Sequence, residues 1–175
     1  MRENVEEIDF ELLHDSFVLK AIHGLGWVIV CKNMGEFVYK NIPARIISED
    51  FLSNEDESAI VDYKIYRFKG VLKFLHVDMD SFQKHTRDFY DLDWNRLPFG
   101  LCYLQSQYNM AKPNSLNEMN SRTAELSKPI KFVQVDLYFV KNKIYFGELA
   151  FYPSNGLEVF NPPSMDYELG KLINL

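Results

Sequence analysis

The alternation of apolar and polar residues is most regular between residues 133 and 153, VQVDLYFVKNKIYFGELAFYP. β-Branched and aromatic residues flank a break centred on Asn142, a pattern that predicts two strands and a turn. A loop of residues 141–143 would place Asp136 directly opposite Glu148, on a face shared with Gln134, Tyr138, Phe146 and Ala150. The other face would take Val133, Val135, Leu137, Phe139, Tyr145, Leu149 and Phe151. A two-residue loop would move one carboxylate to this apolar face, so we predict the longer loop.

Directly opposed carboxylates repel, because their Cβ atoms lie about 5 Å apart, unless a positive charge lies between them. Mg²⁺ bound together with nucleotide phosphates would supply this charge, since carboxylate oxygens are ligands that it prefers. A basic side chain of a neighbouring strand, Lys64, Lys73 or an arginine, would serve as well. The pattern leaves both interpretations open.

A second hairpin is predicted over residues 62–78, where KIYRF and VLKFLHV flank Lys69 and Gly70. Gly70 suits the positive φ of a tight turn. Because side chains alternate along a strand, Lys64 and Arg67 are expected on opposite faces.

One amphipathic helix is predicted over residues 116–127, because Leu116, Met119, Thr123 and Leu126 recur at helical spacing. Ser115 and Glu118 form a potential capping box. The tail from residue 164 is a candidate for a short helix. Residues 81–100 show no period, and we expect an irregular segment that covers a site or caps the fold.

In the N-terminal part, residues 17–32 read as a β-hairpin with Gly24 and Gly26 at its tip. Residues 34–45 resemble a connection, and residues 45–52, RIISEDFL, read as a strand. Backbone amides at a glycine tip can approach phosphate closely.

Bulk properties narrow the class of protein. The chain has 175 residues, 47% of them hydrophobic, which suits one domain with a substantial core. The net charge of −6 argues against a nucleic-acid surface. We expect a soluble cytoplasmic protein, because no secretory signal and no apolar run of about 18 residues is present. His76 and His85 have no further ligands nearby in sequence, so we reject a zinc site.

Several stretches together resemble the TupA-like, teichuronopeptide-biosynthesis branch of the ATP-grasp superfamily. They are FVLKAIHGLGWVIVCK, RIISEDFL, DYKIYRFKGVLKFLHVDMDSFQKHTRDFYDLDWNRLPF and FVQVDLYFVKNKIYFGELAFYPSNG, in that order. The resemblance covers roughly residues 8 to 170. It implies an α+β ATP-grasp-like fold with a mostly antiparallel sheet, few helices and an incomplete N-terminal portion. Residues 17–52 would be the remnant of a nucleotide-binding subdomain, and residues 60–175 the C-terminal subdomain of the single partial domain 1–175.

The resemblance also implies ATP and Mg²⁺ as cofactors. Lys20 is the expected contact of the α and β phosphates, and the segment from Gly24 through Gly26 to Trp27 the glycine-rich cover over them. The strand that meets adenine is expected at Glu49, Asp50, Phe51 and Leu52.

In the C-terminal part the resemblance places Lys64 or Arg67 at the transferring phosphate and makes Asp136 and Glu148 the magnesium ligands. These residue types suit phosphoryl transfer, which depends on positioning and charge neutralisation. The implied activity is an ATP-dependent carboxylate-amine ligase of cell-envelope polysaccharide biosynthesis. Its partners would be a nucleotide and a carboxylate-bearing saccharide or peptide acceptor, and exposed sheet edges would allow a homo-oligomer.

The chain departs from the family pattern in four places. Ala150 stands where an Asn or Thr ligand is usual, and Leu25 replaces a serine of the flap. The segment between Cys31 and Arg45 is short, and we expect the domain that precedes the ATP-grasp region in relatives to be absent. We therefore expect weak or absent catalysis by the isolated chain.

Two alternatives belong to other classes. One is a non-catalytic, degenerate ATP-grasp fragment or interaction module. The other is a glycosyltransferase, because Asp78 and Asp80 form the DxD arrangement that holds a metal and a nucleotide sugar.

Overall fold

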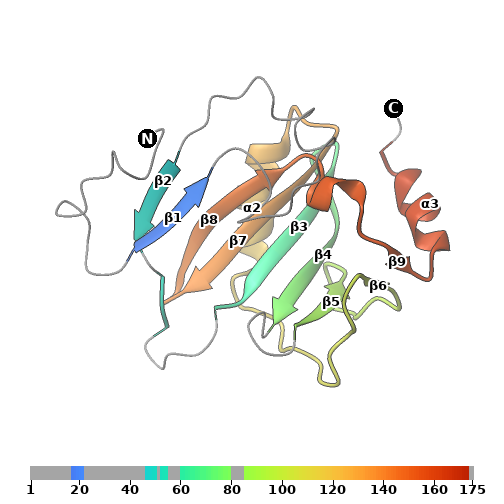
Figure 1. Ribbon diagram of the computed structural model, residues 1–175, viewed down its shortest axis with the longest axis horizontal. Coiled ribbons are helices and arrows are strands. Elements are labelled where there is room, and N and C mark those ends of the chain that lie inside the picture. The colour runs from blue at the N-terminus through green and yellow to red at the C-terminus, as the bar shows by residue number, and fades with distance from the viewer. Residues whose placement is uncertain (1–16, 22–45, 51, 55–59, 80–84, 174–175) are drawn as a thin grey trace. The chain divides into compact units, whose positions relative to one another are not determined.

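The computed structural model describes residues 17–21, 46–50, 52–54, 60–79 and 85–173, and the chain divides into two compact units, Met1–Leu52 and Ser53–Leu175 (Figure 1). In the first unit, β1 (Phe17–Ala21) pairs antiparallel with β2 (Ile46–Asp50). Both strands were predicted. The glycine tip, the second arm of the first hairpin and the connection 34–45 lie outside the described residues.

The second unit is built on a five-stranded antiparallel sheet of order β5-β4-β3-β7-β8 (Figure 1). Its strands are β3 (Asp62–Phe68), β4 (Val71–Met79), β5 (Thr86–Tyr90), β7 (Phe132–Val140) and β8 (Lys143–Ala150). Two short strands, β6 (Gly100–Leu101) and β9 (Phe160–Asn161), pair with each other. The helices are α2 (Leu116–Ser127), the 3-10 turn η3 (Pro153–Gly156) and α3 (Ser164–Gly170). The expected α+β class with a mostly antiparallel sheet is confirmed.

The hairpin of β3 and β4 turns at Lys69 and Gly70, as predicted. Both residues have positive φ, 50° and 76°, which matches the right-handed twist of the two strands. The hairpin begins at the Asp62–Asp78 pair, so its open end carries two carboxylates.

The prediction for residues 81–100 was wrong where β5 forms. Thr86–Tyr90 pairs along β4, and four of its five residues are buried. Arg87 and Asp88 are buried because each has an ion-pair partner, Arg87 with Asp78 and Asp88 with Arg96. Buried charges on an edge strand hide the alternation that normally reveals a strand.

One face of the sheet packs against α2, which lies behind the sheet in Figure 1. The core between them contains Tyr63, Ile65, Val133, Val135, Leu137, Leu116 and Met119. The helix has the predicted bounds, but two details differ. Leu126 is 43% exposed and Ser127 is buried instead. The buried hydroxyl of Ser127 is satisfied because it donates to the carbonyl of Thr123 at 2.8 Å.

The predicted capping box at the start of α2 does not form. Ser115 precedes the helix with φ −81° and ψ −1°, and its side chain makes no capping hydrogen bond. A capping side chain reaches the helix amides from an extended backbone, which Ser115 lacks.

The other face of the sheet forms a second core around Tyr66, Phe68, Phe74, Phe89, Phe99 and Leu101. Residues of β9 and α3 pack against it, among them Phe160, Met165 and Leu169. The predicted short helix in the tail is therefore real, and it covers one end of this face. Within the described part of the chain, no helix is long and apolar enough to cross a membrane.

The turn between β7 and β8 corrects the predicted loop. It contains two residues, Lys141 and Asn142, both with positive φ, and Val140 pairs with Lys143. Tyr145 therefore faces the side of Tyr138, and Phe146 the side of Leu137, the reverse of the prediction.

Candidate functional site

A β-bulge in β8 places two carboxylates on one face of the sheet. Leu137 pairs with Phe146 and Val135 pairs with Leu149, so Gly147 and Glu148 both lie across from Asp136. Beyond the bulge, Ala150 pairs with Gln134. Asp136 and Glu148 thus share a face despite the two-residue turn, because the extra residue restores the register that a longer loop would have given.

Gly147 makes the bulge possible. A Cβ at this position would lie 3.1 Å from the Tyr138 ring, 3.2 Å from the Asp136 Cβ and 3.2 Å from the Asp136 carbonyl oxygen. These distances are shorter than ordinary contacts, so a side chain here would push against the strand that carries Asp136. The glycine fits where the two backbones approach closely.

Lys64 supplies the positive charge beside Asp136. The two residues are partners in the β3–β7 pairing, and the Lys64 ammonium donates a hydrogen bond to Asp136 Oδ2. It also lies 2.8 Å from Asp62 Oδ2. Burial opposes the charge of Lys64, but Asp136 and Asp62 outweigh burial and raise its pKa well above the usual value. Lys64 is therefore fully protonated at neutral pH.

Asp136 is the most enclosed member of this group. Its residue is only 1% exposed, and its second oxygen, Oδ1, accepts a hydrogen bond of 2.8 Å from the Gln134 side chain. Both carboxylate oxygens of Asp136 thus accept hydrogen bonds from side chains, Lys64 and Gln134, whose place a bound cation could take. Lys64 is one of the basic side chains that the sequence suggested for this role, and the magnesium interpretation stays a prediction.

Asp62 is a third carboxylate at this place, and sequence reasoning missed it. Burial raises its pKa to about 6, although Lys64 acts in the opposite direction. Its Oδ1 atom is buried without a hydrogen-bond partner. The signal was present in the sequence, because Asp62 stands two residues before Lys64 and so shares its face of β3.

The phenol of Tyr138 lies close enough to these charged groups to be affected by all of them. Burial raises the pKa of its phenol to about 12, and Asp62, Asp136 and Glu148 add to the rise while Lys64 opposes it. We call Asp62, Lys64, Asp136, Tyr138 and Glu148 the carboxylate cluster. Asp62 and Asp136 both contact the ammonium group of Lys64, and Glu148 acts with them on the phenol.

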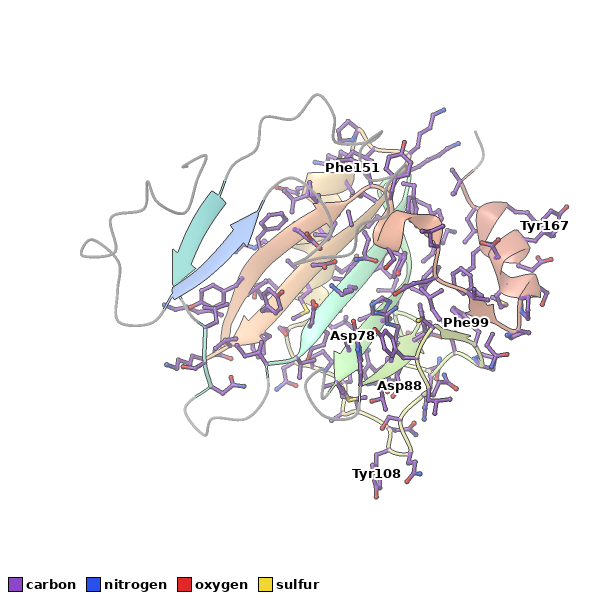
Figure 2. The ribbon with its side chains drawn as sticks, viewed as in Figure 1. Asp78, Asp88, Phe99, Tyr108, Phe151 and Tyr167 are labelled. Carbon is purple, nitrogen blue, oxygen red and sulfur yellow. The ribbon has the colours of Figure 1, made fainter. Side chains whose placement is uncertain are left out.

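A second polar network lies next to the carboxylate cluster on β4 and β5. Arg87 donates to both oxygens of Asp78 at 2.7 and 3.1 Å, and to Glu158 at 2.9 Å. Burial would raise the pKa of Asp78, but His76 and Arg87 hold it well below its usual range. Figure 2 labels Asp78 on this part of the sheet. Arg87 engages both Asp78 oxygens, and Asp80, the second carboxylate of the DxD alternative, lies outside the described residues.

His76 connects this network to the aromatic core. Its Nδ1 lies 3.2 Å from the Tyr66 hydroxyl, while Nε2 is buried without a hydrogen-bond partner, 3.6 Å from Asp78. Burial lowers the pKa of His76 to about 4, so the ring is neutral at physiological pH.

Arg67 lies on the opposite face from Lys64, as the alternation predicted, and its guanidinium is held by α2. It bonds Thr123 Oγ1 at 3.0 and 2.9 Å and the Gly70 carbonyl at 2.6 Å, and it also donates to the carbonyl and side chain of Asn120. The structure therefore does not bring Arg67 together with Lys64, Asp136 and Glu148.

The residues expected to bind nucleotide in the first unit are only partly described. Lys20 lies in β1 opposite Ile47, and Glu49 and Asp50 end β2. Leu52 follows without regular structure. Gly24, Gly26, Trp27 and Phe51 lie outside the described residues.

The carboxylate cluster contains oxygen donors of the kind that magnesium prefers. Among the residues that the structure describes, no three or more His, Cys, Asp or Glu side chains gather as a complete metal cage. Mg²⁺ in nucleotide sites is typically held by one or two carboxylates together with phosphate oxygens and water. Asp136, Glu148 and the unpartnered oxygen of Asp62 are hard oxygen donors of this kind.

Comparison with known proteins gave one finding. Residues 34–174 match the family model described as TupA-like ATPgrasp, which covers most of the chain, the carboxylate cluster included. Curated proteins gave no match, and neither did solved structures.

Proposed function

The chain belongs to the TupA-like ATP-grasp family, and from this premise we propose that it binds Mg-ATP at the carboxylate cluster and couples a carboxylate to an amine. The acceptor would be a carboxylate-bearing saccharide or peptide of the cell envelope. The observation that carries the proposal is the bulge at Gly147, which sets Asp136 and Glu148 on one face beside Lys64.

The carboxylates of the cluster support a divalent cation. Asp62 and Asp136 share one ammonium group, that of Lys64, and carboxylate oxygens are ligands that Mg²⁺ prefers. When bound, Mg²⁺ would offset the phosphate charge and orient the transferring phosphoryl group. Asp136 and Glu148 are its ligands in this proposal.

Lys64 would contact the transferring phosphate. The raised pKa of Lys64 keeps its ammonium group charged. If Asp136 binds the metal, Asp62 remains as a second ion-pair partner that holds Lys64 on this face. Arg67 has no part in this site, because α2 binds its guanidinium on the other face. Lys20, the flap at Gly24 to Trp27 and the strand Glu49 to Leu52 keep the nucleotide contacts that the resemblance implies.

Ala150 favours a second candidate function, nucleotide binding without turnover. It pairs with Gln134 on the face of the cluster and offers no oxygen. A metal with one ligand fewer would still bind phosphate, but it would orient the transferring group less tightly. Release of ADP on addition of a uronic acid and an amino acid separates the two candidates, because the ligase produces ADP and the binding protein does not.

The binding proposal is tested by thermal unfolding with millimolar Mg-ATP. At 100 times its dissociation constant, a ligand stabilises the folded state by about 2.7 kcal/mol, which corresponds to roughly 5–10 °C for a chain of this size. We expect this shift in the wild type and its loss in Asp136→Asn. Asp93→Asn is the matched control, because Asp93 is an exposed residue of a turn. An unmoved melting temperature in the wild type, or an equal shift in Asp136→Asn, would refute the site.

A further inference from the structure

A pocket of about 550 Å³ opens on the same face of the sheet as the carboxylate cluster. The sheet contributes its floor, and the chain from Phe151 to α3 contributes its walls. Figure 2 shows Phe151 near the end of β8. Aromatic rings dominate the lining, which includes Tyr66, Phe68, Phe74, Phe132, Phe151, Tyr152 and Phe160.

The pocket and the cluster are consecutive along β3. Asp62 and Lys64 belong to the cluster, and the next two residues on that face, Tyr66 and Phe68, line the pocket. Alternate residues of a strand are about 6.5–7 Å apart. A molecule bound over Tyr66 therefore lies next to Lys64 on the same face of β3. Glu158 also lines the pocket and connects it to Arg87.

The lining offers one positive and one negative side chain that have no ion-pair partner among the described residues. Glu158 is neutralised by Arg87. Lys131 and Asp166 have no ion pair within the described part of the chain, and both are exposed at the pocket. Among the residues that the structure describes, the lining contains no Asn, Gln, Ser, Thr or His. A saccharide would need several such hydrogen-bonding side chains. A mostly apolar ligand needs only a few polar groups to orient it, and Lys131 and Asp166 can supply them.

We infer that this pocket binds a zwitterion with an apolar body, an amino acid or short peptide, which is the amine-bearing substrate of the ligase. The inference rests on the proposed function. Asp166 receives the ammonium group, Lys131 receives the carboxylate, and the aromatic rings pack against the apolar side chain and attract the cation.

The experiment measures binding to the full chain, without nucleotide, by calorimetry and saturation-transfer NMR. The probes are L-phenylalanine, N-acetyl-L-phenylalanine, L-phenylalaninamide and D-glucuronate. We expect L-phenylalanine to bind at least tenfold more tightly than the N-acetyl and amide forms, each of which lacks one charge. Asp166→Asn should remove the preference over N-acetyl-L-phenylalanine, and Lys131→Met the preference over the amide.

A variant that fills the pocket separates binding there from binding elsewhere. Gly170 lines the pocket, and a Cβ at this position meets no atom within 4 Å. Gly170→Leu should therefore fold normally and lower L-phenylalanine affinity at least tenfold. Glu168→Leu adds the same side chain to an exposed position of α3 and should leave the affinity unchanged.

Two outcomes overturn the inference: equal L-phenylalanine binding by the wild type and Gly170→Leu, or binding of D-glucuronate in preference to L-phenylalanine. The Asp136→Asn variant should bind L-phenylalanine like the wild type. A failure of the nucleotide site therefore leaves this readout intact, and a failure of the pocket leaves the Mg-ATP shift intact.

Discussion

Replacing Arg67 by methionine distinguishes a structural role of this residue from a catalytic role. The residue is 2% exposed, and its guanidinium joins β3 to α2 through Thr123, Asn120 and Gly70. Methionine keeps most of the side-chain volume but removes all of these donors. The change therefore tests whether Arg67 stabilises the fold or acts on phosphate.

The magnitude follows from two opposing effects. Two backbone carbonyls, of Gly70 and Asn120, lose a charged donor, and buried acceptors left unpaired cost about 1–3 kcal/mol each. Burial lowers the pKa of Arg67, so removing its charge recovers part of a desolvation cost. The expected net loss is about 2–4 kcal/mol of the free energy of unfolding, or roughly 5–15 °C in melting temperature.

Urea unfolding of the wild type and the variant measures this loss. Arg122→Met is the matched control, because the Arg122 side chain is 70% exposed and pairs with Glu118 on the same helix. The control should change stability by no more than about 0.5 kcal/mol. At a temperature where Arg67→Met is folded, its Mg-ATP affinity should equal that of the wild type, whereas Lys64→Met should lose affinity. A loss of stability under about 1 kcal/mol, or a folded Arg67→Met that no longer binds Mg-ATP, would refute the reasoning.

Two further predictions concern the carboxylate cluster. Because the folded-state pKa of Asp62 is raised from 3.8 to about 6, its stabilising contribution is complete below pH about 4 and is lost as the pH rises through 6. Asp62→Asn should match the wild type in urea unfolding near pH 4 and exceed it by up to about 3 kcal/mol above pH 7; a constant difference would contradict this. Gly147→Ala should lower the free energy of unfolding by about 1–2 kcal/mol and weaken Mg-ATP binding, since the methyl group meets Asp136 and Tyr138. Unchanged nucleotide affinity in Gly147→Ala would show that the bulge does not position Asp136.

Elements whose signal is local were predictable. The turn at Lys69 and Gly70 and the bounds of α2 depend on residues close together in sequence, where periodicity and turn chemistry act directly. The strand β5 was missed because its burial depends on ion pairs with β4 and with Arg96, which no local pattern shows.

The sharing of one face by Asp136 and Glu148 was predicted through a wrong loop. The alternation of side chains predicted that both carboxylates lie on one face, and we assigned this to a three-residue loop. The turn has only two residues, and the additional residue forms the bulge at Gly147 instead. A bulge and a longer loop produce the same register beyond them, so the pattern of side chains does not distinguish the two.

Apart from Tyr145 and Phe146, the alternation in the sequence determined which side chains of β7 and β8 share a face, and the resemblance of its motifs identified the family. Only the tertiary structure decided which groups meet. It placed Asp62 beside Lys64, attached Arg67 to α2, and brought the chain after β8 over Tyr66 and Phe68 to form a pocket. Periodicity fixes the direction of a side chain relative to its own strand, whereas contacts between distant segments depend on register, bulges and the path of the connecting chain.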